Sequence, residues 1–244
     1  MGRTMSFYDL RDALAQPGCV VCRLKAEATE RYLDGLLWEN VNDPGLRHEL
    51  RRARGFCHEH AWGLVRDGAS AGVAIIMRDV LQEVLAVLRE GEFQVLPTLS
   101  LRRTQEALDP SQPAGATAEL VRQLSPQATC PACAQAEIME DIYLSTLVEQ
   151  LLGEDGLLAG YQASDGLCLT HFRQALARVR DEVAFEALVN AQRAIWERLI
   201  GHLSEIIRKS DYRFQHEPRG EEVGGALRAI AALSGSRGGR GKSY

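Results

Sequence analysis

Cys19-Val-Val-Cys22 and Cys57-His-Glu-His60 are the most informative motifs of this sequence, because both recur later in the chain, as Cys130-Pro-Ala-Cys133 and Cys168-Leu-Thr-His171. Cys130 follows Cys19 by 111 residues, and His171 follows His60 by the same number. The four motifs together use all six cysteines of the chain. This pattern indicates a tandem duplication.

The repeat extends beyond the cysteines and histidines. With the same offset and no gap, six further identical pairs align: Tyr32 with Tyr143, Leu33 with Leu144, Leu36 with Leu147, Gly45 with Gly156, Leu46 with Leu157 and Gly55 with Gly166. Upstream, Ser6 aligns with Thr117, and either residue can cap a short helix before a cysteine pair. The repeat predicts two consecutive modules at 4–94 and 114–209, a linker at 95–113 and a tail at 210–244.

The periodicity of apolar residues is helical nearly everywhere. The clearest stripe follows the i, i+3, i+4, i+7 rule, which predicts a helix with one broad core face. Its members are Val73, Ile76, Met77, Val80, Leu81, Val84, Leu85 and Leu88. We therefore expect an all-α protein of two pseudo-symmetric helical modules, each organised by one metal site. In the tail we expect a short helix from Val223 to Leu233 and a disordered basic end.

The cysteine and histidine motifs have the form of metal-binding clips. A soft or borderline divalent ion needs deprotonated ligands that converge at about 2.0 to 2.3 Å, and C-x-x-C and C-x-x-H clips supply them in pairs. Thirty-four residues separate the two clips of each copy, which leaves room for a long helix, a turn and a short helix back. We expect both clips of one copy to share one ion. The predicted ligands are Cys19, Cys22, Cys57 and His60 in the first site, and Cys130, Cys133, Cys168 and His171 in the second.

The repeat also separates the two histidines of the first C-x-x-H clip. His58 aligns with Leu169, whereas His60 aligns with His171, so His60 is the predicted ligand. His58 is expected at the surface or as a neighbour of the metal. His48, His202 and His216 have no counterpart in the other copy and are interpreted as surface or packing residues.

Zinc is the predicted metal, with two ions per chain, because sites of three cysteines and one histidine are common for zinc. An iron–sulfur cluster is the alternative, although such clusters more often take four cysteines. The cysteines could also be buried small residues or redox-active thiols. Four protein ligands leave no open position for a substrate, which is typical of a structural zinc site. No catalytic residue is assigned, and an enzymatic role is disfavoured.

Composition limits the classes of partner. The chain has 244 residues, 45% of them hydrophobic, and a formal net charge of −5, so it can bury a core but lacks an overall nucleic-acid-binding charge. The tail carries Arg237, Arg240 and Lys242, which could bind RNA only weakly. The sequence shows neither an apolar leader nor an apolar run of membrane length, which predicts a cytoplasmic protein without membrane attachment.

The motifs resemble those of a bacterial family with paired C-P-x-C and G-F-C-x-x-H sequences. The resemblance rests on the two C-x-x-C clips together with Gly55-Phe56-Cys57 and Gly166-Leu167-Cys168, and it covers most of residues 15 to 205. Val20 stands where the family often has proline, but this residue is not a predicted ligand. Because the family is one of unknown function, the resemblance implies the fold and the metal sites but no activity.

Two functions remain open from the sequence. In the first, the zinc-stapled helical modules form an interaction or adaptor module that binds a protein partner. In the second, the chain is a redox or metal sensor, in which oxidation of the thiolates releases zinc and unfolds a module.

Overall fold

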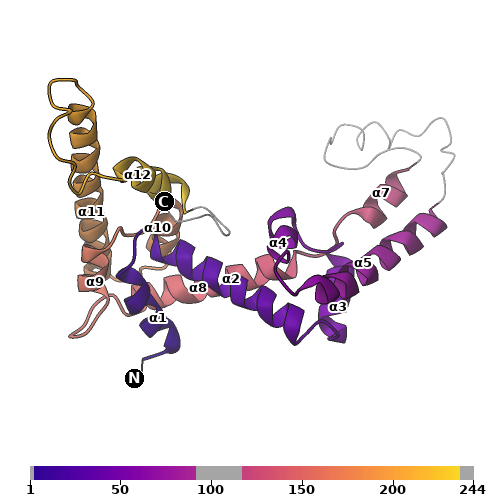
Figure 1. Ribbon diagram of the computed structural model, residues 1–244. Helices are drawn as coiled ribbons and strands as arrows, with labels where there is room; N and C mark the ends of the chain where they lie inside the picture. The colour runs from indigo at the N-terminus through magenta and orange to yellow at the C-terminus, as the bar shows by residue number, and fades with distance from the viewer. Residues whose placement is uncertain (1–2, 92–116, 237–244) are drawn as a thin grey trace, which may run out of the picture. The chain divides into compact units, whose positions relative to one another are not determined.

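The computed structural model describes residues 3–91 and 117–236, and these residues form eleven helices and no strand. The predicted all-α fold is confirmed. In chain order the helices are α1 (Met5–Leu14), α2 (Val20–Trp38), α3 (Pro44–Arg52), α4 (His58–Gly63), α5 (Ser70–Glu90), α7 (Ala118–Leu124), α8 (Pro131–Glu149), α9 (Leu158–Ala163), α10 (Leu169–Leu176), α11 (Glu182–Lys209) and α12 (Gly225–Ser234), as labelled in Figure 1. The linker expected at 95–113 lies outside the described residues.

The helices recur at the spacing of the cysteine motifs. Helix α8 begins and ends 111 residues after α2, and α10 begins 111 residues after α4. The chain nevertheless divides into two compact units that differ from the consecutive modules expected at 4–94 and 114–209. The first unit combines Met1–Thr29 with Ala136–Tyr244, and the second unit is Glu30–Gln135. Each unit therefore joins the beginning of one repeat to the end of the other.

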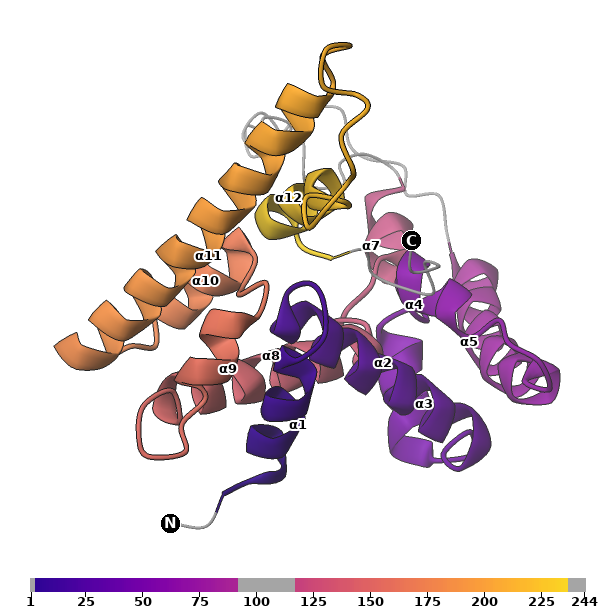
Figure 2. The same ribbon diagram turned by 60° about the vertical axis from the view of Figure 1, so that its left-hand side comes forward.

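The first unit has a core built by helices from both ends of the chain. Helix α1 packs on α9, and α9 packs on α11, as Figure 2 shows. The largest fully buried side chains of this core are Phe7, Leu10, Tyr143, Leu144, Leu147, Leu151, Tyr161 and Leu167. Burying an aliphatic or phenyl side chain of this size contributes about 1.5–3 kcal/mol, so this core binds the N-terminal helix firmly to the second half of the chain.

The second unit has its own core, in which α5 packs against α3 and α7. Its buried apolar side chains include Leu33, Leu36, Leu37, Leu50, Leu64, Ile76 and Val80. The apolar stripe of α5 is wider than the buried face of that helix. Among the described residues, Leu81, Leu85 and Leu88 are exposed at 60%, 47% and 48%, so the expectation that the whole stripe is core is wrong for these three. The described neighbours cover only the side of α5 that carries Ile76 and Val80.

The tail is an ordered part of the first unit up to residue 236. The helix expected from Val223 to Leu233 is present as α12, Gly225–Ser234, which packs on α10 and α11. Residues 237–244, where we expect the disordered basic end, lie outside the described part of the chain. None of the helices in the described ranges combines the length and the apolar character needed to cross a membrane.

Candidate metal centres

Each C-x-x-C clip sits at the start of a long helix. Cys19 directly precedes α2 and Cys130 directly precedes α8, so Cys22 and Cys133 lie in the first turns. Pro131 occupies the first position of α8, where the missing N–H of proline costs no hydrogen bond. The unpaired N–H groups and positive dipole end of a helix N-terminus stabilise thiolates. Each C-x-x-C clip is therefore placed where its two cysteine sulfurs are less costly to ionise.

Each C-x-x-H clip starts a short helix. Cys57 is the N-cap of α4 and Cys168 is the N-cap of α10, both with extended backbone, which places the histidine in the first helical turn. Two residues earlier the chain turns sharply through Gly55, with φ of 98°, and Gly166, with φ of 70°. Only glycine adopts such angles without strain, so these two conserved turn positions of the repeat aim the cysteine and the histidine at one point.

The structure brings the eight predicted residues into two groups, but it exchanges the clips between the repeats. The first group is Cys19, Cys22, Cys168 and His171, in the first unit, and the second group is Cys57, His60, Cys130 and Cys133, in the second unit. Within each group the four ligand atoms lie within 4.8 Å of one another. The expectation that both clips of one copy share a site is wrong.

The first long helix is shared by the two units. Helix α2 has 19 residues and is therefore about 28 Å long at 1.5 Å per residue. Its start, with Cys22, belongs to the first unit, whereas its residues from Glu30 onward belong to the second unit, which also holds the next clip. The clip of α4 instead meets the start of α8, where the second copy's cysteine pair begins.

The first group has the dimensions of a tetrahedral metal site. Nδ1 of His171 lies 3.3 Å from Sγ of Cys19, 3.3 Å from Sγ of Cys22 and 3.2 Å from Sγ of Cys168. The Sγ atoms of Cys22 and Cys168 are 3.8 Å apart. A regular tetrahedron with metal–sulfur bonds of about 2.3 Å separates its sulfurs by about 3.8 Å, so the donor atoms fit a zinc ion at their centre.

The second group repeats this geometry with slightly different distances. Nδ1 of His60 lies 3.2 Å from Sγ of Cys57, 3.6 Å from Sγ of Cys130 and 3.3 Å from Sγ of Cys133. The Sγ atoms of Cys57 and Cys133 are 3.6 Å apart. His58, in contrast, is exposed, and its ring lies edge-on to Trp62 at a centroid distance of 6.4 Å. His60 and not His58 therefore belongs to the group.

Burial and hydrogen bonds among the four donors shift the pKa values of the first group. Hydrogen bonding to Cys168 raises the pKa of the Cys19 thiol, and the same contact, with a second one from Cys22, lowers the pKa of Cys168. Burial alone would lower the pKa of His171, but hydrogen bonds to the sulfurs of Cys168 and Cys22 raise it to about 9. The group thus concentrates negative charge on sulfur and holds protons between the donors, and a divalent ion would take the place of those protons.

The second group shows the same crowding of thiols. Burial and the neighbouring Cys57 sulfur raise the pKa of Cys133 to about 12. Adjacent thiols resist joint ionisation because like charges repel each other, and a cation at their centre removes this penalty. All six cysteines are free thiols and so remain available as ligands.

Glu140 of α8 supports the histidine of the first group. Oε1 of Glu140 lies 3.6 Å from Nε2 of His171, and its other oxygen accepts a hydrogen bond from Lys25. Burial opposes ionisation of Glu140, but hydrogen bonds from Lys25 and Gln174 and the charges of Lys25 and His171 together outweigh it and hold the pKa of the carboxyl below its ordinary value. A carboxylate on the far nitrogen of a ligating histidine fixes the ring and increases its basicity. The matching position of the repeat is Thr29, whose hydroxyl donates to the Lys25 carbonyl oxygen.

Replacing Glu140 with alanine should weaken metal binding in the first group about 10- to 100-fold, because outer partners of ligating histidines contribute this much to affinity. Competition with a chromogenic chelator measures the affinity of each ion. Glu137→Ala is the matched control, since Glu137 is exposed on the same helix. Equal affinities in Glu140→Ala and the control would show that the carboxylate does not act on the metal.

Gln192 of α11 is a functional residue that the sequence pattern does not reveal. Its side chain is 1% exposed, and Oε1 accepts hydrogen bonds from the Tyr161 hydroxyl and from the Leu167 N–H, the latter at 3.0 Å. Nε2 donates to the Leu167 carbonyl at 3.2 Å. Gln192 thereby fixes the backbone immediately before Cys168. The corresponding residue of the first copy is Leu81, so comparison of the repeats gives no signal for this role.

Comparison with known proteins agrees with the resemblance found in the sequence. A family of unknown function, DUF6062, matches residues 1–238. The chain belongs to this family. A relative described as an "Uncharacterized 23.9 kDa protein in xynA 3'region", from Caldicellulosiruptor sp. (strain Rt8B.4), is 26% identical over 198 residues, which are 81% of this chain and 85% of the relative. No solved structure matches the chain.

Proposed function

We propose that this member of the DUF6062 family is a structural zinc protein, with one zinc ion in each of the two groups. The observation that carries the proposal is the completeness of each donor set. Three sulfurs and one imidazole nitrogen lie within 4.8 Å of one another in each group, and in the first group the imidazole nitrogen is 3.2 to 3.3 Å from all three sulfurs. Four protein ligands satisfy zinc fully, and such closed sites are typical of structural and not catalytic zinc.

In this proposal each ion acts as a cross-link between distant parts of the chain. The first group joins residues separated by 146 to 152 positions, and the second joins residues separated by 70 to 76 positions. Closing such long loops is costly in chain entropy, and a metal clip fixes them in the folded state. In small structural sites the free energy of zinc binding is about 10–16 kcal/mol, which is ample to determine the fold of either unit.

Zinc is favoured over an iron–sulfur cluster by the donor set. Zinc takes three cysteines and one histidine readily, whereas clusters more often use four cysteines. Elemental analysis of the purified, tag-free chain should find two zinc ions per molecule. A brown protein that contains iron and inorganic sulfide would overturn the assignment, and a metal-free protein that keeps its full helicity would overturn the structural role.

We expect the surfaces of the helices to carry the function of the protein, because four protein ligands leave each zinc ion no open coordination position for a substrate. We expect an interaction or adaptor role with a protein partner, in the cytoplasm, where thiols are kept reduced. A protein that binds the zinc-loaded chain should no longer bind when zinc is removed by chelation, and its binding should return when zinc is restored. Equal binding by the zinc-loaded and zinc-free chains would separate the interaction from the metal sites.

A further inference from the structure

Helix α12 is held against the first unit by contacts before the helix and in its first turn. At the N-terminal side, the chain from 211 to 224 returns along the end of α11, where Lys209 pairs with the buried Glu222 at 2.9 Å and Arg208 pairs with Glu217. Within α12, Nη2 of Arg228 donates to Nδ1 of His202 at 2.9 Å. These contacts belong to α11 and the tail alone and do not involve the metal ligands.

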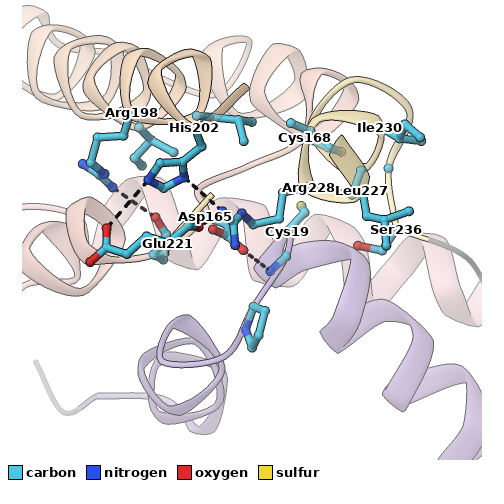
Figure 3. A pocket seen from close by; sticks show the side chains of 18 of the residues that line it. Cys19, Asp165, Cys168, Arg198, His202, Glu221, Leu227, Arg228, Ile230 and Ser236 are labelled. Atoms are coloured by element: carbon cyan, nitrogen blue, oxygen red, sulfur yellow. Dashed lines mark hydrogen bonds and ion pairs between the residues drawn. The ribbon is translucent and has the colours of Figure 1, made fainter. Parts of the chain in front are cut away.

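Beyond these contacts, α12 forms one wall of a cavity of about 950 Å³ in the first unit. Leu227 and Ile230 of α12 face this cavity, and Ile195 and Leu199 of α11 line it as well. Figure 3 shows that Cys19 and Cys168 of the first metal group also border it, together with the Arg228–His202 pair. The cavity therefore lies between the tail helix and the metal ligands.

The C-terminal end of α12 touches the metal group itself. The backbone N–H of Ser236 donates to Sγ of Cys22 at 3.5 Å. Gly235, which ends the helix, has φ of 86° and ψ of 162°, a conformation open only to glycine, and a Cβ there would lie 3.6 Å from the same sulfur. This turn directs the Ser236 N–H at Cys22. An N–H···S bond of this kind stabilises a metal-bound thiolate, as the outer shell of a metal site generally does.

We infer that α12 is a latch coupled to the metal of the first group: zinc at Cys19, Cys22, Cys168 and His171 favours the helix closed over the cavity, and loss of that zinc makes the helix open more readily. The inference rests on the proposed function, because it requires zinc in the first group. Zinc would hold Sγ of Cys22 in place as the acceptor of the Ser236 N–H, whereas without zinc this side chain is free to move away from the donor. Release of α12 would uncover the apolar side chains of Ile195 and Leu199.

The coupling must act in both directions, because a metal that favours the closed helix is itself favoured by the closed helix to the same extent. Ser236→Pro removes the donating N–H and suits the extended ψ of Gly235, whereas Ser236→Ala keeps the N–H and serves as the matched variant. With the full chain loaded with two zinc ions, Ser236→Pro should release one ion about threefold to tenfold more readily to a chelator, as expected for the loss of one hydrogen bond of ordinary net strength. The other ion, and both ions of Ser236→Ala, should behave as in the parent chain.

Hydrogen exchange of the α12 amides tests the reverse direction. In Cys22→Ser, which loses the first ion, α12 should exchange faster while α5 of the second unit keeps its protection. In Cys133→Ser, which loses the second ion, α12 should stay protected. If the first unit of Cys22→Ser unfolds as a whole, the two Ser236 variants carry the test. If Ser236→Pro and Ser236→Ala both bind two zinc ions and release them equally readily, the latch is overturned but the proposed function is not. If the parent chain binds no zinc, both are overturned.

Discussion

A chain that carries both Cys22→Ser and Cys168→Ser is expected to keep one of its two zinc ions, whereas a chain with Cys22→Ser and Cys57→Ser is expected to keep none. Cys22 and Cys168 belong to the first group, 3.8 Å apart, so the second substitution damages a site that is already lost. Cys57 belongs to the second group, so the other pair of substitutions damages both sites. The two double variants share Cys22→Ser, differ only in the second substitution and carry the same number of serines.

Zinc content measured by native mass spectrometry, with circular dichroism to follow helicity, distinguishes the two outcomes. Pairing of clips within each copy would give the reverse result, with no zinc in the Cys22 and Cys168 variant and one zinc in the Cys22 and Cys57 variant. The single variants Cys22→Ser and Cys168→Ser provide the reference, because each should keep one ion. The experiment thus tests the exchange of clips without requiring a crystal.

Gly166→Ala should destabilise the first unit strongly, by about 2–5 kcal/mol, from left-handed backbone strain of about 1–2 kcal/mol and overpacking of about 1–3 kcal/mol. Gly166 has φ of 70°, and an added Cβ would lie 2.9 Å from Oε1 of Gln192 and 3.0 Å from Cδ1 of Ile195. Gln192 cannot move aside easily, because its amide is buried and bonded to both the N–H and the carbonyl of Leu167.

Gly55→Ala is the natural comparison, because Gly55 occupies the same position of the other repeat. Its φ is 98°, but the nearest atom to an added Cβ would be Cγ1 of Val80 at a comfortable 3.8 Å. Only the backbone strain remains, so the expected cost is about 1–2 kcal/mol. Urea unfolding at a fixed free zinc concentration measures both variants. Equal destabilisation by the two substitutions would show that Gln192 does not restrict the Gly166 turn.

The sequence is informative about helices and ligands because both leave local signals. The helical period of apolar residues predicts the all-α fold, and the repeated clips identify the eight residues that the structure gathers into two groups. Comparison of the two copies also separates His60 from His58, since only His60 has a histidine partner in the other copy.

The pairing of the clips leaves no such signal, because two copies of one motif are chemically interchangeable. The pairing follows from the division of the chain into units, in which the start of α2 belongs to one unit and the rest of α2, with Cys57, to the other, and this is a property of the folded chain. Glu140 and Gln192 are missed for a related reason. Their counterparts in the first copy are Thr29 and Leu81, so each supports the first group only. Comparison of the two copies detects only residues that both copies share, and it therefore misses these two.

The exchange of clips also sets an order for folding during synthesis. The second unit is one continuous stretch, Glu30–Gln135, and all four of its ligands have been made once Cys133 has emerged from the ribosome. The first unit is discontinuous, and its cysteine pair near the N-terminus must wait for Cys168 and His171. When those residues arrive, the folded inner unit has already shortened the open loop between them and lowered the entropy cost of closing it. The two metal groups are thus nested, and the inner one prepares the chain for the outer one.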